Sequence, residues 1–465
     1  MYFTAFFPFF AILVAYSFRG PNHWAFAMAV ACFFQSASPV LVAAGGRVSG
    51  IAPAFVLMFV GLCYVYGALY VTEQRHRFKM LKAPSTIWLF LFVVVGVAGA
   101  LALPRLFEGA VRVLPPREGL DSGFTVPLAK SGTNYIQAFY LLCVFFLFAS
   151  LRFLIEKGVV DRSSVIKGIC YGAGLSVLLG TYQVLAYHSG LPWPASVLNS
   201  NIGVAQLLNQ TAFGIKRMSA TFLEPSQMSM HFLGAFGLIA FGLRRKVLGL
   251  WLMAALVMST SSTAYVGLAL LLLIWISLDL PTRARKVWPV AILSIVVIGI
   301  GVLIDQIYFD SAFSDALLFN KIGSASGQSR LYADELALRT LFESFGLGAG
   351  VGSARASSLP ATLLATVGIP GFVCFSAVVW VVLAQANLDK TDDGRAVFFG
   401  LIGLLIGWGL SIPDLNFPLF WLLAAVATGV RQGGVRSSDK EPPFFNTTND
   451  NGQKPETFRI IREPL

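Results

Sequence analysis

Residues 86–104 read TIWLFLFVVVGVAGALALP, a run without a single charged side chain. About 20 apolar residues in a helix cross the roughly 30 Å hydrocarbon core of a bilayer. In lipid, a helix satisfies its backbone hydrogen bonds within its own segment. This run therefore predicts a membrane-spanning helix.

Runs of the same kind recur along the chain, and the composition agrees with them. Hydrophobic residues make up 56% of the 465 residues and charged residues only 12%, which is about half the charged share of a soluble domain. Mean hydropathy is +0.72. We predict an all-α polytopic membrane protein with about 13 transmembrane helices, in a range of about 12–14. The spans are expected near 2–17, 24–43, 51–72, 86–104, 134–155, 164–187, 226–243, 247–260, 262–280, 287–305, 360–386, 396–411 and 416–430.

The net charge of +11 does not indicate a nucleic-acid-binding protein, because the basic residues stand in short clusters between apolar runs. Such clusters mark cytoplasmic loops. Five of them alternate correctly with the spans, at 75–82, 152–167, 244–246, 283–286 and 390–395. The N-terminus is then outside. Residues 1–430 form the transmembrane domain, with outer-face loops at 105–133, 188–225 and 306–359, and the polar residues 431–465 form a disordered cytoplasmic tail.

Basic residues that this topology places outside need another explanation. Arginine suits phosphate, because its planar fork donates two hydrogen bonds and stays charged. Solvated loop charge is the alternative for any single one of these residues. They are Arg47, Arg105, Arg112, Arg117, Lys130, Lys216, Arg217, Lys321, Arg330, Arg339 and Arg355.

The segment from Arg217 to Pro225 leads into the span at 226–243. Pro225 suits the first turn of a helix and forces Glu224 to be extended. Glu224 could simply cap the helix, since a carboxylate there is favoured by the helix dipole. Alternatively, Arg217 binds phosphate and Glu224 accepts a proton in one pocket at the membrane surface.

Residues 327–345 are expected to form an amphipathic helix in the last outer loop. Its apolar face would hold Leu331, Leu338, Leu341, Phe342 and Phe345. Ser329 is its expected N-cap, which puts Arg330 in the first turn. An arginine there opposes the helix dipole, and this local cost indicates a functional role. Arg339 stands four residues from both Glu335 and Glu343, so ordinary helix ion pairs explain it equally well.

A glycine-rich stretch, Gly346-Leu347-Gly348-Ala349-Gly350-Val351-Gly352, follows this helix. It is not a phosphate-binding loop, because its glycines are out of register and no strand precedes it. A flexible or tightly packed loop explains it, and Arg355 could reach a pocket from it. The five cysteines and four histidines form no ligand-spaced cluster, so we predict neither a metal nor a cofactor.

Three stretches of the sequence, two of them described above, together resemble the O-antigen polymerase and O-antigen ligase family of bacterial envelope glycosyltransferases. They are Arg217 with Phe222-Leu223-Glu224-Pro225, then Gly327-Gln328-Ser329-Arg330 with the amphipathic helix and Gly346-Leu347-Gly348-Ala349-Gly350, and then Ala365-Thr366-Val367-Gly368-Ile369-Pro370-Gly371. The turn at 261–263 lacks the arginine that the family often has there. Ligases carry a histidine near the place of 357–360, where this chain has none, and this favours a polymerase.

The resemblance implies a fold of the glycosyltransferase C-superfamily type in the bacterial inner membrane, with the active site on the periplasmic face. It implies a metal-independent inverting glycosyltransferase that joins oligosaccharide repeats carried on undecaprenyl diphosphate into O-antigen or exopolysaccharide. Arg217 and Arg330 would stabilise the diphosphate, with Arg339 and Arg355 as further candidates, and Glu224 would be the base. Membrane lipids, a chain-length regulator and a flippase are the other implied partners.

Other functions stay open. An O-antigen ligase or a protein oligosaccharide transferase would use the same chemistry. A lipid or polysaccharide transporter is the rival from another class, but transporters carry charged or broken helices near the midplane. The predicted spans are almost free of ionisable groups, apart from residues near their edges such as His231, Asp305 and Asp414. A purely structural protein would leave the outer arginines unexplained.

Overall fold

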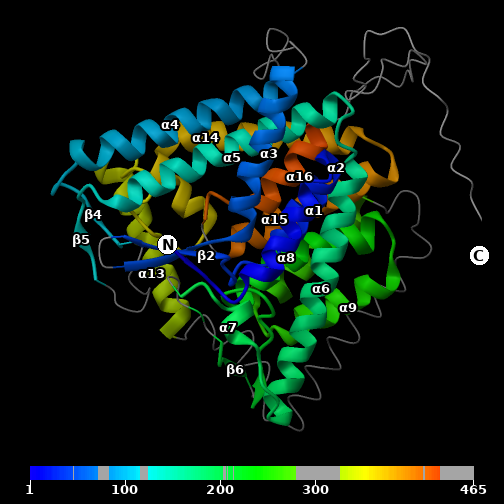
Figure 1. Cartoon of the computed structure of the whole chain (residues 1–465). Coiled ribbons are helices and arrows are strands. Elements are labelled where there is room, and N and C mark those ends of the chain that lie inside the picture. The colour runs from blue at the N-terminus through cyan, green and yellow to red at the C-terminus, as the bar shows by residue number, and fades with distance from the viewer. Residues whose placement is uncertain are drawn as a thin grey trace, which may run out of the picture. The chain divides into compact units, whose positions relative to one another are not determined.

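The computed structural model describes residues 1–44, 47–71, 83–115, 124–202, 206, 208–212, 214–278, 325–411 and 414–429. The predicted span 287–305, the first part of the last outer loop (306–324) and the tail 431–465 lie outside these residues. Most of the described chain is helical, as predicted, and short strands form three small antiparallel sheets (Figure 1).

The helices follow the apolar runs closely along most of the described chain. They are α1 (Phe7–Ser17), α2 (Pro21–Ala31), α3 (Pro53–Val71), α4 (Pro84–Leu106), α5 (Gly132–Glu156), α6 (Arg162–Ser189), α7 (Ala195–Leu198), α8 (Pro225–Phe236), the π-helical segment η4 (Gly237–Gly242), α9 (Lys246–Met258), α13 (Ala325–Glu343), α14 (Leu359–Leu388), α15 (Asp392–Leu410) and α16 (Pro418–Gly429). A further helix covers Ser262–Leu278. The strands are β1 (Tyr2–Phe3), β2 (Val40–Ala44), β3 (Arg47–Ile51), β4 (Arg112–Val113), β5 (Val126–Pro127), β6 (Thr211–Ala212) and β7 (Ile215–Lys216).

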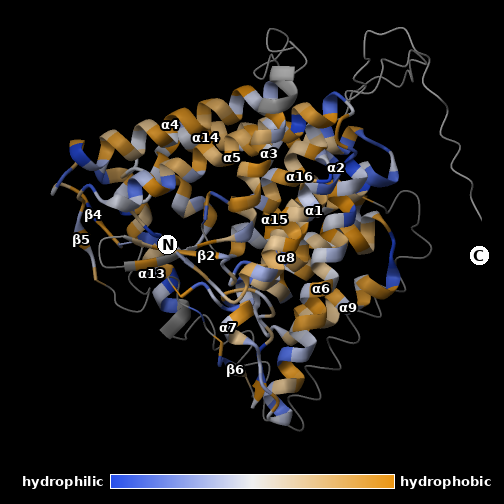
Figure 2. Ribbon diagram, viewed as in Figure 1, coloured by the Kyte–Doolittle hydropathy of each residue, from blue (hydrophilic) through white to orange (hydrophobic). Residues whose placement is uncertain are grey.

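Five helices in the described part of the chain are long and apolar enough to cross a membrane, namely α4, α5, α6, α14 and α15. Shorter apolar helices include α1, α9, α16 and Ser262–Leu278. Figure 2 shows the hydrophobic colour along the long helices and the hydrophilic colour mainly at their ends. The chain is therefore compatible with a multi-pass membrane protein, and the number of thirteen spans stays a prediction.

The prediction of a span over 24–43 is wrong in its second half. Helix α2 ends at Ala31, and the chain continues without helix into β2. The Ser36 hydroxyl donates to the Leu198 carbonyl at 2.8 Å, and the Ser38 amide donates to the Ser200 hydroxyl at 3.1 Å. Polar side chains thus bind a distant loop here instead of continuing a helix.

The first predicted span, 2–17, is also shorter than expected, because its start forms a strand. Strand β1 pairs with β2, and β2 pairs with β3, all antiparallel. Tyr2 lies opposite Leu41, and Val40 lies opposite Ile51. The N-terminal residues therefore form a small sheet beside the helices.

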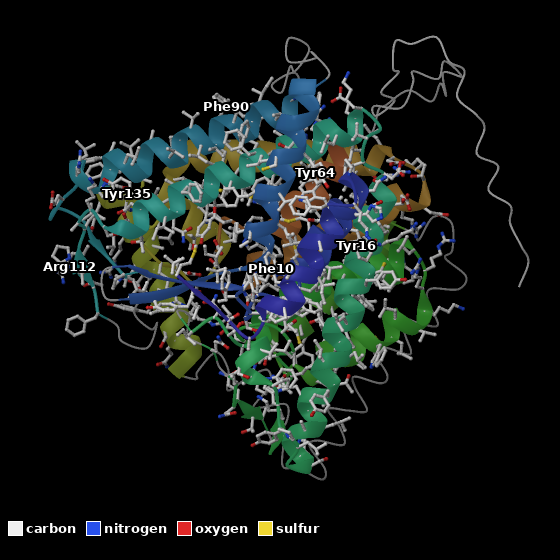
Figure 3. The ribbon with its side chains drawn as sticks, viewed as in Figure 1. Phe10, Tyr16, Tyr64, Phe90, Arg112 and Tyr135 are labelled. Carbon is white, nitrogen blue, oxygen red and sulfur yellow. The ribbon has the colours of Figure 1, made fainter. Side chains whose placement is uncertain are left out.

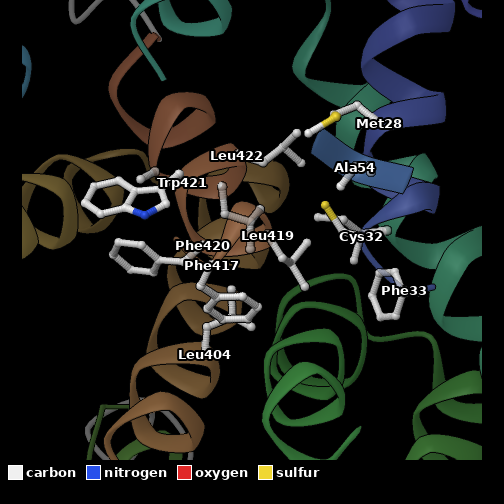
Figure 4. Packing of buried hydrophobic residues seen from close by; sticks show 14 of the residues in the cluster. Met28, Cys32, Phe33, Ala54, Leu404, Phe417, Leu419, Phe420, Trp421 and Leu422 are labelled. Atoms are coloured by element: carbon white, nitrogen blue, oxygen red, sulfur yellow. The ribbon is translucent and has the colours of Figure 1, made fainter. Parts of the chain in front are cut away.

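Helix α16 lies within the bundle, where all of its residues are buried. Its aromatic side chains pack against α15, with the rings of Trp408 and Phe420 5.0 Å apart between centroids. Figure 4 shows Phe417, Phe420 and Trp421 beside Leu404 in this cluster. A helix that is enclosed by protein does not have to match the thickness of the bilayer, which explains its length of only 12 residues.

Loops predicted on the same side of the membrane lie together. Arg162, the first residue of α6, binds Asp389 at 2.5 Å and Asp393 at 3.2 Å, which joins two of the predicted cytoplasmic regions. On the other side, the Arg112 amide donates to Glu343 at 3.3 Å, which joins the loop of β4 and β5 to α13. Arg112, labelled in Figure 3, also donates to the Thr125 carbonyl at 2.7 Å. This contact accounts for one of the unexplained outer arginines.

Helix α14 is broken at Gly368, which has φ 64° and ψ −167°. The break leaves backbone groups without partners in the helix, and the glycine-rich loop supplies them. The Ala365 carbonyl accepts from the Ala349 amide at 2.7 Å, and the Thr366 carbonyl accepts from the Gly350 amide at 3.0 Å. In the opposite direction, the Ile369 amide donates to the Gly346 carbonyl at 2.9 Å. The loop therefore takes the place of the missing helical turn.

The glycines of this loop are required by backbone conformation and by close approach. Gly348 has φ 80°, a left-handed conformation that favours glycine. A Cβ atom added there would lie 2.8 Å from the Gly368 nitrogen. Of the two interpretations of the glycine-rich stretch, the tightly packed loop is the observed one.

Candidate functional site

The segment that leads into α8 is fixed by side chains of α6. The Ser219 and Ala220 amides both donate to Gln183 Oε1 at 3.0 Å. The Thr221 and Ser176 hydroxyls are hydrogen-bonded at 2.8 Å. Ala220 has a left-handed φ of 50°, a conformation that a surrounding structure must hold in place. Because the middle of this segment is buried and bound, Arg217 and Glu224 near its two ends have fixed relative positions.

Arg217 follows β7 and binds the carboxyl end of α9. Its Nε donates to the Ser259 carbonyl at 3.2 Å, and its Nη2 donates to the Thr260 carbonyl at 3.3 Å. Its Nη1 donates to Gln210 Oε1 at 3.1 Å. Carbonyl groups at a helix C-terminus carry partial negative charge. They stabilise a guanidinium that forms no ion pair with any described residue.

Glu224 is the N-cap residue of α8 and has an extended backbone, as the following Pro225 predicts. Its Oε1 accepts a hydrogen bond from the Ser226 hydroxyl. The side chain is half-buried, at the mouth of the helix. Both interpretations from the sequence, a helix-capping carboxylate and a proton acceptor, are compatible with this position.

Arg330 lies on α13, but the start of that helix differs from the prediction. The helix begins at Ala325, so Ser329 is not its N-cap and Arg330 lies in the second turn. The argument from the helix dipole therefore does not apply to Arg330, because the dipole effect is confined to the first turn.

The inward face of α13 also differs from the prediction. Leu331, Leu338, Phe342 and Phe345 are exposed, and of the predicted apolar face only Leu341 is buried. The buried positions after Arg330 are mostly small: Ala333, Leu336, Ala337, Thr340, Leu341 and Ser344. Small side chains allow close helix packing. Because Arg330 stands three residues before Ala333, it shares the inward face of the helix.

The charges of Glu224 and Arg330 both act on Arg217. Burial lowers the pKa of the Arg217 guanidinium, the Glu224 carboxylate raises it again, and the Arg330 charge lowers it further. Three residues from two distant parts of the chain are therefore within electrostatic reach. Arg330 is half-buried and forms no ion pair with the described residues. Two cations with one carboxylate leave a net positive site.

The two remaining candidate arginines have other surroundings. Arg339 is 65% exposed and pairs with Glu335 at 2.7 Å, as the four-residue spacing predicts. Arg355 is half-buried, and its amide donates to the Leu114 carbonyl at 3.0 Å in the loop of β4 and β5. Neither residue acts on the charge of Arg217 in the way that Arg330 does.

Sequence reasoning missed the residues that hold Arg217 in place. Lys216 is buried, and burial and the neighbouring Arg217 charge lower the pKa of its ammonium group. Its Nζ donates to the Leu208 carbonyl. Gln210 binds Arg217 directly, and Gln183 binds the segment behind it. Lys216 had a signal in the sequence, as a basic residue on the outer side, whereas an isolated glutamine has none.

No protein-family model matches the chain, and no curated protein matches its sequence. The resemblance to the O-antigen polymerase and ligase family therefore depends on the motifs quoted above.

Proposed function

We propose that the chain is a membrane-embedded, inverting glycosyltransferase that polymerises oligosaccharide repeats carried on undecaprenyl diphosphate. The observation that carries this proposal is that the buried, anchored Arg217 is acted on by the charges of both Arg330 and Glu224. Two guanidinium groups near each other raise the free energy of the empty site, and a bound dianion lowers it again. A diphosphate is a ligand of this charge.

Arg217 retains donors for such a ligand. A guanidinium has five N–H donors, and three are used by Gln210, Ser259 and Thr260. The other two make no hydrogen bond with the described residues. Its anchored position means that little reorganisation is needed when negative charge develops on a leaving group.

The reaction follows from these groups. A hydroxyl oxygen of the acceptor sugar attacks the anomeric carbon of the donor glycan. The bond from that carbon to the diphosphate oxygen breaks, and its electron pair stays on the diphosphate, which Arg217 and Arg330 stabilise. The hydroxyl proton passes to the Glu224 carboxylate. Attack opposite to the leaving group inverts the anomeric configuration.

A deletion strain tests this function directly. Loss of a polymerase leaves single repeats capped on lipid A, whereas loss of an O-antigen ligase leaves long glycan on undecaprenyl diphosphate. The second profile would mean that the chain is a ligase or a protein oligosaccharide transferase that uses the same site.

A lipid or polysaccharide transporter is the second candidate, because α14 is broken and transporters often bind substrate at broken helices. Its freed backbone groups, however, bind the glycine-rich loop and do not face a substrate path. Uptake or export of glycan by the purified chain in vesicles, without change in chain length, would favour this candidate.

A further inference from the structure

Helix α13 and the turn that follows it carry a stripe of exposed apolar side chains on the outer side. Leu331, Leu338, Phe342 and Phe345 follow one another at intervals of seven, four and three residues and are 63%, 43%, 77% and 86% exposed. Leu331, Leu338 and Phe342 lie on one side of α13. Phe345 lies two residues beyond the helix end at Glu343 and has a φ of 53°. In water, a patch of this kind is unfavourable, and it marks a surface that contacts a membrane or another protein.

The stripe continues into the apolar surface of two long helices. The Phe345 ring lies 6.4 Å from the ring of Phe107, which caps α4. The next residue, Gly346, is packed beside Ile369 of α14, since an added Cβ would lie 3.2 Å from the Ile369 Cδ1 atom. Leu106, Ile369 and Val373 are themselves exposed. Because α4 and α14 are long enough to span a bilayer, lipid that covers them also reaches the end of the stripe.

Charged side chains lie between and beside the apolar ones, because Glu335 stands between Leu331 and Leu338 on the same side of the helix. Glu335 and Arg339 form their exposed ion pair there, one turn apart. An apolar line next to charged groups is typical of a helix that lies in the plane of a membrane interface. A protein partner would not require continuity with α4 and α14, which favours lipid as the occupant.

We infer that α13 lies at a membrane–water interface, with the stripe Leu331, Leu338, Phe342 and Phe345 among lipid acyl chains. Arg330 precedes Leu331 and shares the opposite, inward face of the helix. The lipid contact therefore fixes the depth of Arg330 near the headgroups, where the diphosphate of a lipid-linked glycan would lie. The lipid contact does not depend on the proposed function, whereas this role of Arg330 does.

Spin labelling tests the lipid contact without any measurement of activity. Leu338→Cys and Phe342→Cys carry nitroxide labels on the stripe, in a chain whose five native cysteines are replaced by alanine. Arg339→Cys is the control at the exposed ion pair, and Leu101→Cys on the exposed side of α4 is the lipid reference. The protein is placed in nanodiscs of phosphatidylethanolamine and phosphatidylglycerol. Collisions with oxygen report acyl chains, and collisions with a water-soluble nickel chelate report solvent.

We expect the labels at 338 and 342 to show an oxygen-to-nickel collision ratio close to that of 101 and severalfold above that of 339. Equal ratios at 338, 342 and 339 would place the stripe in water and overturn the inference. Low collision rates with both reagents at 338 and 342 would mean that protein covers the stripe, and would overturn it as well.

Discussion

The charge of Arg330 on α13 acts on the guanidinium of Arg217, which lies about 110 residues earlier in the chain. Arg217 is anchored on the carboxyl end of α9, and Arg330 comes from the inward face of α13. The Arg330 charge lowers the pKa of Arg217, and the Glu224 carboxylate raises it. The predictions below follow from the proposal that these residues form an anion site.

Arg330→Ala should abolish long glycan chains while expression and membrane insertion persist. Removal of one donor that stabilises a developing anion typically slows catalysis by about 100-fold or more. Arg330→Lys should also be poor, because a point charge does not reproduce the fork. The readout is chain length on a gel of the cellular glycan. Arg339→Ala is the matched control, since it removes an arginine from an exposed ion pair of the same helix and should keep normal chains. Equal effects of the two alanine variants would argue against a specific site.

Arg217→Ala should lower both activity and stability, because Arg217 also ties β7 to the end of α9. Hydrogen bonds from a charged group contribute about 1.5–3 kcal/mol in favourable cases. We expect a lower thermal midpoint in detergent as well as loss of long glycan. Gln210→Ala removes one of the three acceptors and leaves the guanidinium in place. It should therefore lower the glycan chain length and the thermal midpoint much less than Arg217→Ala does. If Arg217→Ala retains normal chain lengths, Arg217 is only a structural residue.

Glu224→Gln should preserve the fold and reduce turnover. Glutamine keeps the size of the side chain and can still accept from the Ser226 hydroxyl, but it is not a base. Loss of a general base typically costs about 10²–10⁴-fold in rate. The measurement is glycan elongation by membranes that contain equal amounts of protein. Turnover near that of the wild type would leave Glu224 with its helix-capping role alone.

Gly348→Ala should destabilise the break in α14. The added Cβ would lie 2.8 Å from the Gly368 nitrogen in a backbone with φ 80°, and a left-handed alanine alone costs about 1–2 kcal/mol. A lower thermal midpoint in detergent is the expected result. Gly409→Ala in α15 is the control, because its new Cβ meets no atom within 4 Å and alanine favours a helix by about 1 kcal/mol. A Gly348→Ala variant as stable as the control would show that the loop is not tightly packed.

The sequence predicted the long helices well, because an apolar run such as 86–104 can satisfy its backbone hydrogen bonds in a bilayer only as a helix. It also predicted the extended Glu224 before Pro225, since proline restricts its neighbour whatever the surroundings. It failed at 24–43, where apolar character suggested a helix and the hydrogen bonds of Ser36 and Ser38 to residues far along the chain produced a strand. Contacts of that kind have no local signal.

In the candidate site, too, some features could be predicted from the local sequence and others could not. Charge singled out Arg217, Glu224 and Arg330, and the charges of the last two act on Arg217. The positional argument for Arg330 failed, because α13 begins at Ala325. The face of α13 was predicted incorrectly, because large apolar residues were assigned to the core, whereas alanine, threonine and serine pack there. In a membrane protein, large apolar side chains can face lipid, so hydrophobicity alone does not identify the inward face.

Binding of farnesyl diphosphate to the purified protein in nanodiscs tests the central claim most directly, because it isolates the lipid diphosphate from the sugar chemistry. The account predicts that the wild type and Arg339→Ala bind it with the same affinity, and that Arg330→Ala binds at least about 10-fold more weakly, a loss of about 1.4 kcal/mol. Equal affinity in all three proteins would contradict the account.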